Sequence, residues 1–254
     1  MEQFFEEFDN PALYDKENQG TFDLEFLAEL ARNCEGPIID IACGTGRITI
    51  PLGLAGHEMI GVDVHKGMLQ AAEDKSKKAN LAITWIHEDC TNLNLDIKSN
   101  FIYSVGNSFQ HFLTNKAQDG LLSSVSRQLK EDGLFVFDTR FPSIEELLQP
   151  PTEEFWTSYI DADTGYKVEL STISHYDGLE QIQQYTTIRK YLNQTKIVKE
   201  LKTRIKLRYV FPKEMERLLD KHQLKILHIY SDWNKNPINT NSYSMIYVCQ
   251  KINN

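Results

Sequence analysis

The stretch Pro37-Ile-Ile-Asp-Ile-Ala-Cys-Gly-Thr-Gly-Arg47 decides the fold of this chain of 254 residues. Its apolar run, residues 38–41, predicts a short buried strand. Gly44 and Gly46 follow at once and allow a tight turn, because glycine adopts backbone angles that other residues avoid. A helix is expected next, over residues 46–55. A strand that passes through a glycine-rich turn into a helix is the first half of a β-α-β unit.

Strands and helices alternate on both sides of this stretch. A helix is expected before it, over residues 21–33, where apolar residues recur at helical spacing. The fold class is therefore α/β, with a doubly wound, mostly parallel sheet of seven strands and helices on both faces. After the glycine turn the expected elements are a strand at 58–63, a helix at 65–79, strands at 81–89 and 101–105, a helix at 115–129, a strand at 134–138, a helix at 212–222 and two mutually antiparallel strands at 224–233 and 242–251.

The helical period disappears between the fifth strand and the helix at 212–222. In residues 197–209 apolar and charged side chains alternate, which is typical of a strand with one buried face. We therefore expect residues 146–209 to form an antiparallel β insertion, and residues 21–145 and 210–254 to form the α/β core. About four strands are expected, divided by turn signals at 163–165, 177–178 and 193–194.

Composition narrows the partners and the location. The hydrophobic fraction of 41% and the charged fraction of 25% are those of a globular protein. A formal net charge of −9 disfavours nucleic acid, because phosphate backbones are negative too. No apolar run approaches the ~20 residues of a membrane span, and no signal peptide is present, so we expect a cytoplasmic protein without a membrane partner. The pattern leaves monomer and homodimer open.

The cysteines carry no metal signature. The chain has 4 of them, and their spacing matches no zinc or other metal motif. We expect free thiols and no metal ion. The four are Cys34, Cys43, Cys90 and Cys249.

Three carboxylates lie at or just after predicted strand ends. Asp40 stands in the first strand, Asp63 ends the second and Asp89 follows the third. In an open α/β sheet, ligands bind at the carboxyl ends of the strands. An acidic group at the end of the second strand can accept hydrogen bonds from both ribose hydroxyls of a nucleoside. The sequence therefore predicts a nucleoside-containing ligand above the glycine turn.

These features closely resemble the class I S-adenosylmethionine-dependent methyltransferases of small-molecule type. In that family a D/E-x-x-x-G-x-G motif follows the first strand, and acidic residues end the second strand and follow the third. The resemblance covers roughly residues 22–141 and the closing strands. It implies a Rossmann-like core and S-adenosylmethionine as the cofactor, with S-adenosylhomocysteine as the product.

The resemblance also implies roles for individual residues. Asp40 would anchor the amino end of the cofactor, Gly44 and Gly46 would pass beneath its methionine part, and Asp63 would bind its ribose. The remaining residues expected on the cofactor are Ala42 and Thr45 of the glycine turn, Val64, Met68, Asp89 and Cys90 around the adenine, and Val105, Gly106 and Asn107 beside the methionine.

The residues that would bind or activate the methyl acceptor are indicated by less specific features of the sequence. Similar family members begin with a Tyr-Asp pair that folds over the cofactor, which implies a lid in residues 1–20 with Tyr14 near the sulfonium. His111 follows the fourth strand and suits a general base, since an unperturbed histidine titrates near pH ~6.5. The expected acceptor is a small amine or hydroxyl, with nitrogen favoured, methylated by in-line displacement beneath the capping insertion. Candidate substrate-binding residues are Arg140, Trp156 and Tyr185.

Two other functions remain open. A module that binds S-adenosylmethionine without turnover would share the same cofactor motif. An NAD-dependent oxidoreductase would also begin with a glycine-rich turn, but Thr49 stands where its third small residue belongs. Asp40 would in addition repel a pyrophosphate, whereas it would attract a methionine ammonium group.

Overall fold

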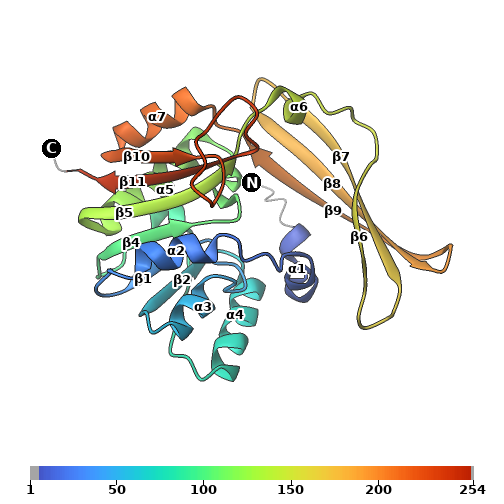
Figure 1. Ribbon diagram of the computed structural model, residues 1–254, viewed down its shortest axis with the longest axis horizontal. Coiled ribbons are helices and arrows are strands. Elements are labelled where there is room, and N and C mark those ends of the chain that lie inside the picture. Colours follow the sequence, from blue (N-terminus) through green and yellow to red (C-terminus); the bar gives the residue numbers. More distant parts are fainter. Residues whose placement is uncertain (1–5, 253–254) are drawn as a thin grey trace. The chain divides into compact units, whose positions relative to one another are not determined.

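The computed structural model describes residues 6–252, which divide into two compact units. The larger unit contains residues 8–143 and 210–252, and the smaller contains residues 144–209 with Glu6 and Glu7. Figure 1 shows the elements of each. Within residues 6–252, no helix combines the length and the apolar character that a membrane span requires.

The larger unit is built of alternating strands and helices. Its elements are α1 (Pro11–Glu17), α2 (Leu24–Ala31), β1 (Ile38–Ile41), α3 (Thr49–Leu54), β2 (Met59–Asp63), α4 (Lys66–Lys78), β3 (Thr84–His87), η2 (Cys90–Asn92), β4 (Ser99–Ser104), η3 (Ser108–His111), α5 (Asn115–Gln128), β5 (Leu129–Arg140), α7 (Pro212–Lys221), β10 (Leu224–Tyr230) and β11 (Ser244–Lys251).

Its seven strands form one sheet in the order β10-β11-β5-β4-β1-β2-β3. Strand β11 is antiparallel to both of its neighbours, whereas the pairs among β1 to β5 are parallel. The predicted fold class is therefore confirmed, including the antiparallel closing pair. The strand order reverses between β1 and β4, and a ligand crevice is expected at this switch point.

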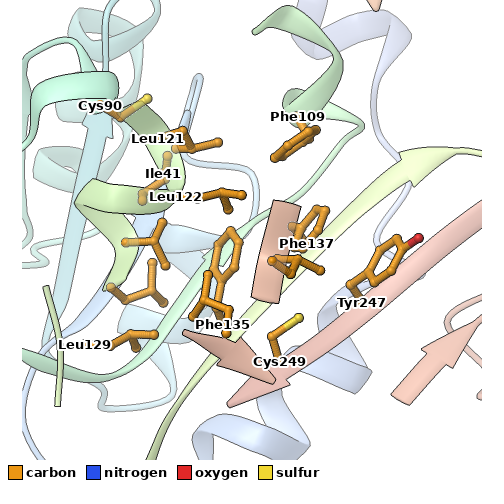
Figure 2. Packing of buried hydrophobic residues seen from close by; sticks show 14 of the residues in the cluster. Ile41, Cys90, Phe109, Leu121, Leu122, Leu129, Phe135, Phe137, Tyr247 and Cys249 are labelled. Atoms are coloured by element: carbon orange, nitrogen blue, oxygen red, sulfur yellow. The ribbon is translucent and has the colours of Figure 1, made fainter. Parts of the chain in front are cut away.

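Helices cover both faces of this sheet (Figure 1). On one face, α5 and α7 pack on side chains of β4, β5 and β11. Figure 2 shows this cluster, in which the rings of Phe137 and Tyr247 stack with their centroids 5.0 Å apart. On the other face, α2 and α3 contribute Phe26, Leu27 and Leu52. Burial on both sides explains why three of the four residues of β1 are isoleucine and why all four, Asp40 included, are buried.

The residues that begin each helix explain where it starts. The Thr114 side chain accepts a hydrogen bond from the backbone N–H of Ala117 at the start of α5. The His65 ring does the same for Met68 in α4. Pro212 occupies the first turn of α7, where its missing N–H leaves no bond unmade.

The N-terminal segment contains a helix that the sequence pattern did not indicate. Residues Glu6–Phe8 form a short 3-10 helix, η1, and α1 follows. The Asn10 side chain caps α1 by accepting a hydrogen bond from Leu13 N, and Pro11 fills its first position. Seven residues are too few for a clear apolar period, so only the Asn-Pro start signal was available. Residues 1–5 of the predicted lid lie outside the described part of the chain.

The smaller unit is an antiparallel sheet in the order β6-β7-β8-β9. In β9, Thr203 is buried between the exposed Lys202 and Arg204, so the expected alternation holds over residues 201–205. It fails at the end of the strand, where Arg208 is buried as well as Leu207. Ile197, near the start of β9, is 50% exposed. The elements of this unit are α6 (Ile144–Leu147), β6 (Glu154–Ile160), β7 (Lys167–Asp177), β8 (Ile182–Asn193) and β9 (Lys196–Arg208).

Candidate functional site

The glycine turn after β1 has a left-handed backbone at three positions. Ala42, Gly44 and Gly46 have φ angles of 57°, 56° and 79°. A Cβ on Gly46 would lie 2.9 Å from the Trp85 ring, so packing as well as the φ angle demands glycine there. A Cβ on Gly44 would meet only the Met68 methyl group, at 3.5 Å. Gly44 therefore leaves the space that a ligand lying across the turn requires.

Asp63 joins this turn to the end of β2. The backbone N–H of Gly44 donates to its Oδ2 at 2.8 Å, and the N–H of His65 donates to its Oδ1 at 2.7 Å. Burial raises the pKa of Asp63, while these two N–H groups act in the opposite direction. Each carboxylate oxygen can accept more than one hydrogen bond. Asp63 can therefore hold the turn and also accept hydroxyl groups of a ligand.

Asp40 is a buried carboxylate beneath the turn. It is 3% exposed, and its Oδ2 accepts a hydrogen bond from Thr49 Oγ1 at 2.6 Å. Burial raises the pKa of Asp40 to about 7, against the opposing effect of the Thr49 hydroxyl. Near neutral pH this carboxyl group is therefore divided between its protonated and ionised forms. A nearby cation would favour the ionised form.

Two side-chain bridges fasten the glycine turn to the N-terminal part of the larger unit. Arg47 donates to both oxygens of the almost fully buried Asp23, at 2.7 and 2.5 Å. Thr45 Oγ1 donates to Asp15 of α1 at 2.5 Å, and Lys75 Nζ of α4 donates to the other Asp15 oxygen at 2.8 Å. Helix α1 is thereby bound to the predicted cofactor turn.

Tyr14 and His111 contact the same phenylalanine. The Phe8 ring packs edge-on against Tyr14, with 5.7 Å between centroids, and against His111, with 5.4 Å. The charges of Arg47 and Asp63 both act on Tyr14, whose pKa is raised mainly by burial. The structure thus brings the two predicted catalytic residues into one aromatic group beside the glycine turn.

His111 differs from the sequence expectation in its basicity. Burial lowers the pKa of His111 to about 4, and the positive charge of Arg140 acts in the same direction. His111 is therefore not the unperturbed histidine that titrates near 6.5, and its catalytic role stays a prediction. The imidazole is neutral at physiological pH, and its unprotonated nitrogen can accept a hydrogen bond but is a weak base. Because the charge of Arg140 affects the pKa of His111, the two side chains lie near each other.

The residues predicted around the adenine have mixed environments. Val64 is 41% exposed at the end of β2, whereas Met68 is 2% exposed and packs in the core. Asp89 accepts a hydrogen bond from Thr91 N at 2.9 Å and so caps η2. Cys90 is buried, and burial raises the pKa of its thiol to about 12. These contacts are structural, and the adenine role of the four residues stays a prediction.

The loop after β4 turns sharply and contacts β5. Gly106 and Asn107 have φ angles of 79° and 60°, and a Cβ on Gly106 would meet no atom within 4 Å. Asn107 N donates to Oδ1 of Asp138 at 2.9 Å. Val105 is buried just before this loop and its carbonyl accepts from Ser108 Oγ. The loop therefore has open space on the side where a ligand is expected.

A cavity of about 570 Å³ lies in the larger unit at the ends of β4 and β5. This volume falls within the range of about 300–1,000 Å³ that is usual for small-molecule sites. Its wall includes Arg47 of the glycine turn and Asn107 of the β4 loop. The cavity is therefore adjacent to the predicted cofactor residues. Other lining residues are Phe22, Asp23, Gly106, Asp138 and parts of the segment 231–246, including Trp233 and Tyr243.

Two predicted substrate residues belong to the smaller unit. Trp156 is 65% exposed on β6. The Tyr185 hydroxyl on β8 donates to Glu146, which also accepts a hydrogen bond from Tyr209 at 2.7 Å. Tyr185 thus has a structural contact with α6 inside its own unit. The substrate role of both residues stays a prediction.

Sequence reasoning missed several polar residues of the site. Asp138 near the end of β5 could have been found by the rule that selected Asp63, because it also ends an apolar strand. The Arg47–Asp23 pair and the Asp15–Thr45 contact had no sequence signal, since their partners lie 24 and 30 residues apart.

Comparison with known sequences agrees with this geometry. A family model described as "Methyltransferase domain" matches residues 38–133. A glycine/sarcosine N-methyltransferase of Halorhodospira halochloris is 27% identical over 142 residues, covering 55% of this chain and 53% of that protein. A demethylmenaquinone methyltransferase of Bacteroides fragilis is 33% identical over 132 residues, covering 48% of this chain and 49% of that protein. The chain thus spans about half the length of the curated relatives it matches.

Solved structures share the fold along nearly the whole chain. An S-adenosylmethionine-dependent methyltransferase of Clostridium acetobutylicum superposes with a TM-score of 0.79 at 21% identity, covering 95% of this chain and 97% of that one. The CcbJ methyltransferase of Streptomyces caelestis gives 0.82 at 19%, with 98% of both chains covered. The sugar N-methyltransferase KedS8 of Streptoalloteichus gives 0.71 at 17%, covering 96% and 94%. At identities this low, the TM-scores demonstrate a common fold and no more.

Proposed function

We propose that this chain, whose residues 38–133 form a methyltransferase domain, transfers the methyl group of S-adenosylmethionine to a small-molecule acceptor. The observation that carries the proposal is the hydrogen bond of 2.8 Å between Gly44 N and Asp63. It joins the open glycine turn to a carboxylate at the end of the neighbouring strand. A nucleoside with an attached amino-acid chain needs both features side by side.

The residues present fit this cofactor. The absence of a side chain at Gly44 leaves room above the turn, and Asp63 has lone pairs for two ribose hydroxyls. Asp40 lies beneath the turn as a buried carboxylate, which suits the ammonium group of the cofactor. In support, solved structures with this fold include the aminopentose methyltransferase CalS10 with S-adenosylmethionine bound and MtfA with sinefungin bound.

The chain's own residues would exclude water and align the acceptor. S-adenosylmethionine supplies a methyl group on a positively charged sulfur, and that charge disappears on transfer. The aromatic group of Phe8, Tyr14 and His111 lies beside the glycine turn, and such rings attract a cation and keep water away. Neutral His111 would accept a hydrogen bond from the acceptor and orient its lone pair. Most of the rate enhancement would come from this alignment.

An amine is the acceptor that we favour. Relatives described as glycine/sarcosine N-methyltransferases and a structural neighbour described as a sugar N-methyltransferase support nitrogen as the methylated atom. The cavity beside Asn107 is large enough for a small acceptor. Arg140, Trp156 and Tyr185 remain candidates for acceptor contacts, and we keep the proposal that the antiparallel unit caps the site.

Calorimetric titration with S-adenosylmethionine, S-adenosylhomocysteine and NADH tests the cofactor. We expect micromolar binding of the first two and none of NADH. Binding of NADH alone would overturn the proposal in favour of an oxidoreductase. Turnover is measured as S-adenosylhomocysteine formation with a panel of small amines and alcohols. Tight cofactor binding without turnover of any of them would favour a non-catalytic binding module.

A further inference from the structure

The cavity at the ends of β4 and β5 has three carboxylates in its wall, Asp23, Asp138 and Asp232. In two of them, both oxygens already accept hydrogen bonds within the larger unit. Asp23 accepts from Arg47 with both oxygens. Asp232 accepts from Asn234 N and Asn236 N with one oxygen and from the Asn236 side chain with the other. Neither has an oxygen left that needs a ligand.

Asp138 differs from these two. It is 6% exposed, and its Oδ1 accepts from Asn107 N at 2.9 Å. Besides this bond, the only donor that acts on its carboxylate is its own backbone N–H, among the residues that the structure describes. The side-chain oxygen of Asn107, in the same wall, is buried without a hydrogen-bond partner among residues 6–252. A buried polar atom without a partner is unusual in a folded protein, because desolvation without a hydrogen bond is costly.

We propose that the Oδ2 of Asp138 and the Oδ1 of Asn107 bind the amino group of the methyl acceptor. This inference rests on the proposed function and names the residues that select nitrogen. Both atoms are acceptors, so the group that satisfies them must bring two donors. A single amino nitrogen carries two or three N–H bonds, whereas a hydroxyl brings only one O–H. An alcohol would donate to only one of the two oxygens.

The charges in the cavity wall also favour an amine over an alcohol. The positive charge of Arg47 is neutralised by its two-pronged contact with Asp23, and Asp232 is engaged within its own loop. The ionised form of Asp138 therefore leaves the wall with an uncompensated negative charge. An ammonium group would compensate it, and a hydroxyl group would not.

The rest of the wall suits a small polar molecule. Trp233 packs edge-on against Phe26 at 5.4 Å between centroids and so presents a supported aromatic surface. The segment after β10 is ordered by its own hydrogen bonds, among them Ser242 Oγ accepting from Asn239 N at 3.0 Å. The part of the cavity wall that this segment forms is therefore held in place by its own contacts.

The test compares two matched pairs of probes, glucosamine with glucose and 2-aminoethanol with ethylene glycol. Binding to the whole protein is measured by ligand-observed NMR, with and without saturating S-adenosylhomocysteine. In the wild type we expect each amine to bind at least about tenfold more tightly than its hydroxyl partner. Asp138→Asn preserves the shape and an acceptor for Asn107 N, and it should reduce this preference to less than about threefold. Asp74→Asn, on the exposed surface of α4 and outside the cavity, is the control and should keep it.

A second variant provides an independent test in case Asp138→Asn does not fold. Asn107→Gly removes the side-chain oxygen but suits the φ of 60°, and the backbone N–H to Asp138 remains. It should also lower the amine preference. Absence of amine binding, equal binding of amine and alcohol, or an intact preference in Asp138→Asn would each overturn the inference.

The cofactor's own amino group is the alternative ligand of Asp138. If Asp138→Asn weakens S-adenosylhomocysteine binding about tenfold or more while the wild type shows no amine preference, Asp138 serves the cofactor and the inference is wrong. If the wild type prefers amines but binds neither S-adenosylmethionine nor S-adenosylhomocysteine, the proposed methyltransferase function fails and the amine site stands.

Discussion

At the scale of single residues, the site is governed by buried carboxylates at strand ends. Asp40, Asp63 and Asp138 lie near the carboxyl ends of the parallel strands β1, β2 and β5, and burial raises the pKa of each. What separates them is their hydrogen bonds. Asp63 has backbone donors on both oxygens, Asp40 has a hydroxyl donor, and Asp138 has one backbone donor. Each therefore responds differently to substitution.

Asp63→Ala should weaken binding of S-adenosylhomocysteine by roughly 1–3 kcal/mol, the scale of hydrogen bonds lost with a charged acceptor. It should also lower the melting temperature, because Gly44 N and His65 N lose their acceptor. Calorimetry and circular dichroism measure the two effects. Asp96→Ala, at an exposed position, is the control. Unchanged affinity in a folded Asp63→Ala protein would remove Asp63 from the cofactor site.

Asp40 should make cofactor binding depend on pH. Its pKa of about 7 in the free protein means that binding of the cofactor's ammonium group releases a proton below that pH. Affinity should rise up to about tenfold per pH unit below 7 and level off above it. Calorimetry with S-adenosylhomocysteine from pH 5.5 to 8.5 measures this, and Asp40→Asn should flatten the profile. If affinity still depends on pH in Asp40→Asn but not in Asp138→Asn, the proton that is released on binding comes from Asp138.

His111→Ala should slow turnover at least about tenfold while cofactor affinity stays near the wild-type value, because the imidazole would orient the acceptor. The pKa of about 4 places its titration below the working range. His111 should therefore add no inflection to the rate between pH 6 and 9. Steady-state kinetics measure both effects, with the exposed His228→Ala as control. Turnover equal to that of the wild type would exclude His111 from the site.

At the scale of elements, the glycine turn is held from outside by α1. The Asp15 side chain contacts both Thr45 of the turn and Lys75 of α4, so one residue links three elements. The strands and longer helices followed from apolar periodicity. Helix α1 did not, because its position depends on contacts with residues far along the chain.

Asp15→Asn should release α1 from the turn, because the amide cannot replace the charged contact with Lys75. We expect S-adenosylhomocysteine to dissociate several times faster, with a smaller effect on its association rate. Stopped-flow fluorescence measures both rates. Asp74→Asn, on the exposed surface of α4, is the matched control. Equal dissociation rates in Asp15→Asn and Asp74→Asn would show that α1 does not retain the cofactor.

At the scale of the whole molecule, buried carboxylates make folding stability depend on pH. The pKa of Asp138 is raised from 3.8 to about 7 by burial, so the protonated form is favoured in the folded protein. The stability that it contributes is fully present below pH 3.8 and is lost as pH rises through about 7. His111 acts oppositely, because its lowered pKa makes acid destabilising.

Asp138→Asn removes this pH-dependent contribution to the free energy of unfolding, since an amide stays neutral at every pH. Relative to the wild type, the variant should gain roughly 2–3 kcal/mol of unfolding free energy between pH 5 and pH 8. Urea unfolding at the two pH values measures the difference, and the comparison cancels the contribution of His111. Asp74→Asn should show no such gain. A constant difference between Asp138→Asn and the wild type would mean that Asp138 is ionised at both pH values.

The sequence alone determined the alternation of elements, the mostly parallel sheet and the place of Gly44, Asp40 and Asp63 near the carboxyl ends of the first two strands. These follow from local periodicity and from short spacings along one chain. The tertiary structure decided the pKa of His111, the anchoring of α1 through Asp15, and the burial of Asn107 Oδ1 without a hydrogen-bond partner among residues 6–252. The physical reason is that burial and long-range hydrogen bonds depend on which distant residues pack together, and no local pattern encodes that.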